Sequence, residues 1–340
     1  MDNKVFLQEW FKLTRETRVA IFTETARRMG LPVFAVEKDW WVVHTLRLLF
    51  SLPVSSHMVF KGGTSLSKGW KVIERFSEDI DLALDRSFLG FDGDLGKKKV
   101  SRLRRASYDY ISGTLIHELQ QAFDDFGFHD VSLRIEEVQH IDQDPLVIEI
   151  YYPKLTETDT YLKPGVLLEV GSRSLKEPFT IKPIISYIGE QHSDRLFADQ
   201  AVGIPVVNAE RTLLEKVFLL HEEHQRPMEK RRLNRLSRHL YDIYRLSQTS
   251  HCEAALKDSE LYRTIVNHRS RFVRLSGVDY SQHQPKYINF IPPEDALSEW
   301  KKDYSEMREN MIHTDSPAFG ELIDYLRDFQ SRLNGLTWTL

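Results

Sequence analysis

Two neighbouring segments, Phe60-Lys-Gly-Gly-Thr-Ser-Leu-Ser-Lys68 and Arg75-Phe-Ser-Glu-Asp-Ile-Asp-Leu82, are the most informative part of the chain. The apolar residues before the glycine pair predict a short strand at residues 57–60. A helix is expected from about Thr64 to Ile73. The second segment predicts a strand over residues 76–84, with acidic residues set into an apolar pattern.

The second segment places Asp79 and Asp81 one residue apart. Alternate side chains of a strand share a face, so both carboxylates would point the same way while Ile80 and Leu82 point into a core. Two carboxylates side by side repel each other unless a cation lies between them. Mg²⁺ suits such a pair, because it usually takes one or two carboxylates and completes its shell with water and substrate phosphates.

The glycine pair, Gly62-Gly63, has a separate physical meaning. Glycine lets the backbone approach a ligand closely and adopt a positive φ. A turn that leads into a helix presents free N–H groups to an anion, and Thr64 and Ser65 could cap that helix. An Asp-x-Asp tripeptide alone is common in solvated turns, and a lone glycine pair is most often a tight turn. Here, however, the glycine pair and the Asp-x-Asp tripeptide occur together, in the order strand, glycine turn, helix and strand. This order predicts a phosphate-binding turn beside a metal site.

This succession resembles the first motif of the DNA polymerase β-like nucleotidyltransferase superfamily, and more closely that of its AbiEii/AbiGii toxin branch. The branch carries Gly-Gly-Thr-x-Leu and then Arg-x-Ser-x-Asp-Ile-Asp-Leu, which this chain matches at Gly62, Gly63, Thr64 and Leu66 and at Arg75, Ser77, Asp79, Ile80, Asp81 and Leu82. The spacing between the two halves is slightly longer than in the branch. The similarity is strong over residues 58–85 and weak over residues 160–247.

The resemblance implies a Mg²⁺-dependent (Mn²⁺ possible) nucleotidyltransferase that moves a nucleoside monophosphate from a nucleoside triphosphate to an acceptor hydroxyl. It implies the toxin of a type IV toxin–antitoxin or abortive-infection pair, with a cognate antitoxin as partner and the 3′ end of tRNA as acceptor. Asp79 and Asp81 would bind metal. The nucleotide phosphates would be held by Lys61, Gly62, Gly63, Thr64 and Ser77. A protein or small-molecule acceptor, or a regulator without catalysis, are the alternatives.

The resemblance also implies a third carboxylate on a neighbouring strand. Glu169, in an apolar run from Val166 to Gly171, is the preferred candidate for a catalytic and metal-binding residue. A charged residue in a buried strand needs a partner or a metal, and a salt bridge to Arg173 is the alternative. Glu149, in a similar run, is the competing candidate for the third carboxylate.

Two later helices resemble further motifs of the branch. Lys216 matches a lysine that faces the nucleotide, where it could hold triphosphate oxygens as a compact charge. Asp242 matches a catalytic acidic residue, and Arg238 lies four residues before it, so the two could also form a simple helix ion pair. His239 stands where the branch usually has aspartate, which keeps the regulator alternative open.

The remaining patterns predict an α/β (α+β) fold with two parts. Residues 1–205 would form the nucleotidyltransferase domain, with two N-terminal helices and, as the resemblance implies, a polymerase β-like core with a mixed sheet. Residues 206–340 would form a helical domain. The other predicted elements are a helix over 100–126, strands over 131–139, 146–152 and 166–171, and helices over 206–224 and 228–246.

Composition limits the remaining possibilities. The 340 residues are 41% hydrophobic and 28% charged, as in ordinary globular proteins, and hold a single cysteine. There is no apolar run of membrane-spanning length and the N-terminus is charged, so a cytoplasmic protein without a membrane span is expected. The net charge of -4 excludes a uniformly basic surface. Positive charge concentrates in two runs, which are Lys97, Lys98, Lys99, Arg102, Arg104 and Arg105, and Arg226, Lys230, Arg231, Arg232, Arg235 and Arg238.

Overall fold

The computed structural model describes residues 5–93, 95–138, 140, 143–157, 165–312 and 314–338. The chain divides into two compact units. The first comprises Met1–Gly69 and Phe76–Val206, and the second comprises Trp70–Arg75 and Val207–Leu340. The sequence predicted a boundary after residue 205. It did not predict that a six-residue segment from the middle of the motif region would belong to the second unit.

The first unit is built on a seven-stranded mixed sheet in the order β3-β4-β5-β2-β1-β7-β6. Strand β2 pairs antiparallel with β1 and parallel with β5, while β4 pairs antiparallel with both β3 and β5. This sheet confirms the predicted α/β class. The strands are β1 (Met58–Lys61), β2 (Ile80–Leu84), β3 (Ser132–Ile135), β4 (Leu146–Tyr151), β5 (Val166–Gly171), β6 (Phe179–Ile184) and β7 (Val202–Val207).

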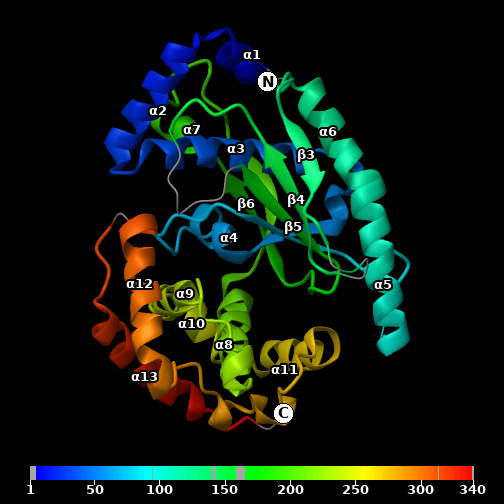
Figure 1. The fold of residues 1–340 in the computed structure, drawn as a ribbon, viewed down its shortest axis with the longest axis vertical. Helices are drawn as coiled ribbons and strands as arrows, with labels where there is room; N and C mark the ends of the chain where they lie inside the picture. The colour runs from blue at the N-terminus through cyan, green and yellow to red at the C-terminus, as the bar shows by residue number, and fades with distance from the viewer. Residues whose placement is uncertain are drawn as a thin grey trace. The chain divides into compact units, whose positions relative to one another are not determined.

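Helices cover this sheet, and a long one runs beside its β3 edge (Figure 1). That long helix consists of α5 and α6, joined by a π-helical turn at Ile111–Leu115. Helix α6 packs on β3, and α3 packs on β5. The helices of the first unit are α1 (Val5–Lys12), α2 (Arg15–Met29), α3 (Val33–Leu49), α4 (Gly62–Lys68), α5 (Lys97–Tyr110), α6 (Ile116–Asp125) and α7 (Tyr187–Gln191).

Several predicted boundaries in this unit are wrong. The strand expected over 131–139 is β3, which ends at Ile135. The first N-terminal helix divides into α1 and α2, because Thr14 caps α2 by accepting a hydrogen bond from the Thr17 N–H at 3.2 Å. Helix α4 begins at Gly62 and ends at Lys68. Strand β2 begins only at Ile80, because the Asp79 carbonyl before it accepts from the Thr64 hydroxyl at 2.5 Å instead of joining the sheet.

The second unit is helical, as expected. Its helices are α8 (Ala209–Gln225), α9 (Ser237–Ser247), α10 (Ser250–Ala255), α11 (Ser259–His268), α12 (Leu297–Met311) and α13 (Phe319–Asn334). The expected helix from residue 206 is wrong at its start, since residues 206 and 207 end β7. None of the described helices is both long and apolar enough to cross a membrane.

The helix expected over 228–246 is present only as α9. In the segment just before α9, backbone N–H groups donate to carboxylates of α8 and α12. Glu223 accepts from the Arg232 N–H at 2.6 Å. Asp303 accepts from the N–H groups of Arg235 and Ser237 at 2.6 and 2.9 Å. Because Arg235 also adopts a φ of 60°, the segment before α9 is not helical.

Candidate active site

Asp81 lies in a row of charged residues that crosses three adjacent strands. The register pairs Asp81 with Lys61 on β1 and with Glu169 on β5. Paired residues of adjacent strands point to the same face, so the two carboxylates and the lysine share one side of the sheet. All three are half-buried, whereas Ile80 and Leu82 are fully buried on the other side, as predicted.

The start of α4 lies directly against the Asp81 carboxylate. Gly62 has a φ of +80°, and a Cβ atom added there would lie 1.9 Å from Asp81 Oδ2. Position 62 therefore requires glycine for two reasons, which are its backbone conformation and the room that Asp81 needs. The glycine pair and the Asp-x-Asp strand, adjacent in the sequence motif, are also in contact in the fold.

Thr64 ties the two halves of the motif together. Its hydroxyl lies 2.9 Å from Ser77 Oγ and 2.5 Å from the Asp79 carbonyl oxygen, and the residue is 1% exposed. The expectation that Thr64 and Ser65 cap the helix is wrong. The N-cap residue is Lys61, without a side-chain cap bond, and Ser65 donates to the Gly62 carbonyl. Thr64 instead positions the segment that carries Asp79.

The surroundings of the two glutamates differ. Glu149, on β4, accepts hydrogen bonds from Arg134 Nε and from the Tyr151 hydroxyl, the latter at 2.9 Å. Its partner in the register on β5 is an apolar leucine. Arg173, the alternative salt-bridge partner for Glu169, contacts Asp144, with 3.3 Å between Nε and Oδ2. The register therefore places Glu169, and not Glu149, opposite Asp81.

Helix α3 supports both halves of the motif through two buried ion pairs that the sequence did not predict. Lys38 pairs with Glu78, the neighbour of Asp79. Asp39 pairs with Lys68 at the end of α4, at 2.7 Å. Burial raises the pKa of Asp39, and the charge of Lys68 opposes that shift. The only signal in the sequence was a run of charged residues, 37–39, inside an otherwise apolar helix.

The second unit contains its own buried charge cluster around Asp242. Arg75 donates to both carboxylate oxygens, at 2.7 and 2.8 Å, and Lys216 Nζ lies 2.9 Å from Oδ2. Burial alone would raise the pKa of Asp242, but the two cations hold it below its usual value. Burial lowers the pKa of Lys216, while Asp242 opposes the shift. With two cations and one anion, the cluster has a net positive charge.

His239 also belongs to this cluster. Its Nδ1 lies 3.3 Å from Lys216 Nζ. Burial and the positive charge of Lys216 hold the pKa of His239 well below its usual value, so the ring is neutral at pH 7. A neutral ring can accept a hydrogen bond from the Lys216 ammonium through Nδ1, as a carboxylate at this position would, but without a negative charge.

The comparisons with known proteins identify the family. A model of the nucleotidyl transferase AbiEii toxin family, of the type IV toxin–antitoxin system, matches residues 47–333. The chain belongs to this family. It is therefore a nucleotidyltransferase of the toxin type, with a nucleoside triphosphate as substrate and an antitoxin as partner. The family generally uses a divalent metal.

Solved structures extend the comparison of the fold. The fold of this chain is similar to that of MenT4, a nucleotidyltransferase toxin from Mycobacterium tuberculosis H37Rv, with a TM-score of 0.56. The two sequences are 18% identical, and the match covers 95% of this chain and 90% of MenT4. JHP933 from Helicobacter pylori is 13% identical, with a TM-score of 0.42 over 89% of this chain and 93% of that one. A comparison with curated proteins finds no match.

The predicted site residues of this AbiEii-family chain are divided between the two units. Lys61, Gly62, Gly63, Thr64, Ser77, Asp79, Asp81 and Glu169 lie in the first unit, and Lys216 and Asp242 lie in the second. Within the described residues, no three His, Cys, Asp or Glu side chains are already arranged as a metal site. The facing pair Asp81 and Glu169 still offers the hard oxygen donors that Mg²⁺ prefers, and this ion commonly takes its other ligands from water and phosphate.

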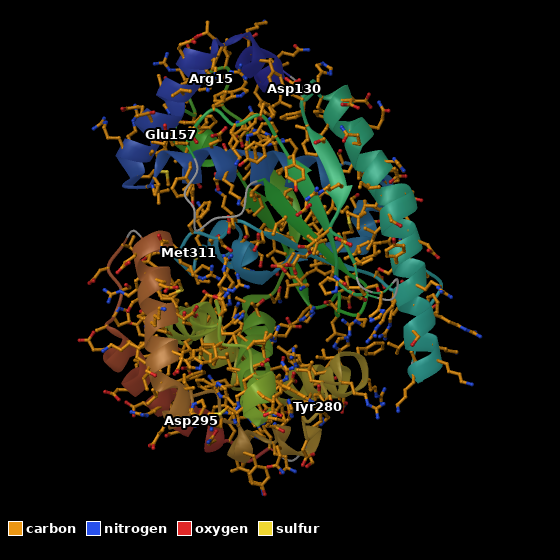
Figure 2. The ribbon with its side chains drawn as sticks, viewed as in Figure 1. Arg15, Asp130, Glu157, Tyr280, Asp295 and Met311 are labelled. Carbon is orange, nitrogen blue, oxygen red and sulfur yellow. The ribbon has the colours of Figure 1, made fainter. Side chains whose placement is uncertain are left out.

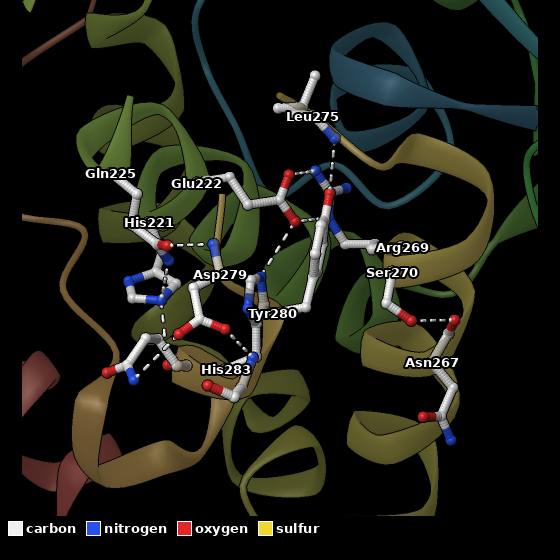
Figure 3. A network of polar contacts seen from close by, with 12 residues as sticks. His221, Glu222, Gln225, Asn267, Arg269, Ser270, Leu275, Asp279, Tyr280 and His283 are labelled. Atoms are coloured by element: carbon white, nitrogen blue, oxygen red, sulfur yellow. Dashed lines mark hydrogen bonds and ion pairs between the residues drawn. The ribbon is translucent and has the colours of Figure 1, made fainter. Parts of the chain in front are cut away.

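A further buried network stabilises the second unit of this toxin (Figure 3). Glu222 accepts two hydrogen bonds from Arg269, both at 2.6 Å, and His283 Nε2 lies 3.1 Å from the same carboxylate. The neighbouring His221 accepts from the Asn289 N–H at 3.0 Å through Nδ1. Burial lowers the pKa of His221 to about 4, so this ring is neutral in the folded protein.

Proposed function

We propose that this toxin transfers a nucleoside monophosphate from a nucleoside triphosphate to an RNA hydroxyl, with the 3′ end of tRNA as acceptor and Mg²⁺ held by Asp79, Asp81 and Glu169. The observation that supports this best is the contact between Gly62 and the Asp81 carboxylate, with Glu169 opposite in the register. It brings a glycine turn suited to phosphate and a pair of oxygen donors to one place in the first unit.

The metal would supply charge neutralisation at the phosphates and a lowered pKa for the acceptor hydroxyl. Mn²⁺, which prefers similar oxygen ligands, could replace Mg²⁺. The donors offered by the chain are carboxylates on neighbouring strands of a packed sheet, so their backbone positions are well determined. We therefore assign the metal-binding role to the half-buried carboxylates of β2, β5 and the residue just before β2.

The remaining roles, which are proton acceptance and phosphate binding, would be filled by residues of the chain. Glu169 would accept the proton of the acceptor hydroxyl, whose oxygen attacks the α-phosphorus while pyrophosphate leaves. Lys61, Gly63 and Ser77, all half-buried and so reachable, would contact the phosphates. In the second unit, Lys216 would hold the triphosphate oxygens, and Asp242 would orient it. Such catalysis consists of positioning and charge stabilisation.

The test is to incubate the protein with Mg²⁺, total tRNA and each α-labelled nucleoside triphosphate, and to follow the label on RNA and on protein. We expect label at the tRNA 3′ end, lost in the Asp79→Asn/Asp81→Asn variant. The Glu149→Gln variant is the matched control, because it removes a charge from the same sheet at a residue already paired with Arg134.

The other outcomes distinguish the alternatives. Label on protein alone would replace RNA with a polypeptide acceptor. Label on RNA in both wild type and the double variant would contradict the assigned carboxylates. No label, together with binding of the triphosphate that does not depend on Mg²⁺, would refute catalysis and support the nucleotide-binding regulator.

A further inference from the structure

Helix α5 carries a dense group of exposed positive charges. Lys97, Lys98, Lys99, Arg102 and Arg105 are all exposed, while Val100, Leu103 and Ser107 form the buried side of the helix. Side chains that end in nitrogen project from this helix in Figure 2. We call these five exposed residues the α5 basic face.

Part of the face forms a straight stripe. Lys98, Arg102 and Arg105 follow each other at spacings of four and three residues, so they lie on one side of the helix. At a rise of 1.5 Å per residue the stripe is about 10 Å long. A row of cations of this length can contact several successive phosphates of a nucleic-acid strand.

The α5 basic face is unfavourable for the helix that carries it. Three lysines occupy its first turn, which has no acidic residue, although the positive end of the helix dipole favours acidic residues there. Lys98 and Arg102 are also like charges four residues apart, which destabilises a helix. Among the residues that the structure describes, none of these five side chains takes part in an ion pair. Helix stability therefore does not account for the charges.

The second basic run differs in this respect. Arg226 and Arg232 both pair with Glu223, at 2.8 and 3.0 Å. Arg231 lies 4.0 Å from a carboxylate oxygen of Asp295. These three arginines are partly neutralised by carboxylates, although Arg232 and Lys230 are exposed. The first run therefore presents the larger set of exposed cations.

We propose that the α5 basic face binds the phosphodiester backbone of the acceptor RNA. The proposal rests on the proposed RNA acceptor and adds the surface that captures it. Helix α5 belongs to the same unit as Asp79, Asp81 and Glu169, so RNA held on it is bound by the unit that carries the proposed metal-binding carboxylates. Because the net charge of the protein is -4, RNA binding requires a local basic surface of this kind.

The test compares two variants with the same change in charge. One is Lys98→Gln/Arg102→Gln/Arg105→Gln, and the control is Lys257→Gln/Lys301→Gln/Lys302→Gln, which removes three exposed lysines of the second unit. Fluorescence anisotropy measures the binding of labelled total tRNA from 50 to 200 mM NaCl, without nucleotide. Urea unfolding shows that each variant is folded, and the α5 variant should be no less stable than the wild type.

We expect the α5 variant to bind tRNA at least about tenfold more weakly at the low end of the salt range. The slope of log affinity against log salt should fall by about 2 to 3, as for three lost phosphate contacts. The control should keep the wild-type slope. Equal slopes for the two variants would overturn the proposal, as would an α5 variant that keeps the wild-type affinity for tRNA.

The two assays distinguish a wrong acceptor from a wrong binding surface. If α5-dependent tRNA binding is present but no label reaches RNA in the transfer assay, the RNA acceptor is wrong and the binding surface stands. If label reaches RNA equally well in the α5 variant and in the control at limiting tRNA, the transfer reaction stands and the surface is wrong.

Discussion

The close contact between Gly62 and Asp81 makes Gly62→Ala a sensitive test of the site. The added methyl carbon would lie 1.9 Å from Asp81 Oδ2, whereas real Cβ contacts are essentially never shorter than 3.0 Å. Either the carboxylate or the start of α4 must therefore move by about 1 Å. A misplacement of about 1 Å in a reacting constellation can cost about 100-fold in rate.

Backbone strain is a second, separate cost of the Gly62→Ala substitution. Gly62 has a φ of +80°, and a residue with a Cβ atom pays roughly 1–2 kcal/mol to adopt this region. The chain offers a matched control in Gly90, which has the same φ of +80° with nothing within 4 Å of its added Cβ atom. Gly90→Ala should therefore show the strain without the clash.

The assay measures both variants for urea unfolding and for transfer of label from an α-labelled nucleoside triphosphate. Both should lose about 1–2 kcal/mol of unfolding free energy, and Gly62→Ala somewhat more. Only Gly62→Ala should lose about 100-fold in kcat/KM. If Gly62→Ala keeps the activity of Gly90→Ala, the contact with Asp81 does not serve catalysis and the reasoning is refuted.

Three further predictions concern other buried or facing charges. Glu169→Gln should lower kcat by about 100-fold or more, as for loss of a general base, and Glu149→Gln by no more than about threefold; equal effects in the transfer assay would contradict the register argument. Lys38→Met should cost about 3–5 kcal/mol in urea unfolding because it leaves Glu78 charged and buried, and adding Glu78→Gln should restore most of this. His221 has a folded pKa of about 4 against about 6.5 when unfolded, so the unfolded state binds more protons between these values. Stability should fall by up to about 3 kcal/mol as the pH drops from 6.5 to 4, and a His221→Gln variant that shows the same fall would contradict this assignment.

The sequence predicted well wherever the pattern was local. The apolar run from Val166 to Gly171 is strand β5 with the predicted bounds, and the long amphipathic helix over 100–126 is present as α5, the π-helical turn and α6. The motif segments led to the correct family because their residue types and order are specific. All of these features are encoded within a few turns or strand lengths of sequence.

The errors have long-range causes. The helix expected over 228–246 is interrupted by Asp303, which lies more than sixty residues away and binds backbone N–H groups before α9. Strand β6 was missed because only one of its residues is buried and its sequence lacks clear alternation. The last two residues of strand β7 were assigned to a helix, because its apolar residues run directly into those of α8.

The features of the site that the sequence did not predict also depend on residues far apart in the chain. The register that pairs Asp81 with Glu169 joins residues 88 positions apart, and no periodicity in one sequence reports it. The resemblance was needed to prefer Glu169 over Glu149. The buried pair of Lys38 with Glu78 was missed because each partner alone resembles an ordinary solvated charge.

The central claim is that Asp79, Asp81 and Glu169 hold a divalent metal beside the bound triphosphate. Fe²⁺, which can replace Mg²⁺ at carboxylate sites, reduces added hydrogen peroxide to hydroxyl radicals that cut the nearest backbone, and mass spectrometry maps the cuts. With nucleoside triphosphate present, we predict cuts near residues 62, 79–81 and 169 that excess Mg²⁺ and the Asp81→Asn substitution both suppress. Cuts confined to other segments, or unchanged by Asp81→Asn, would contradict the account.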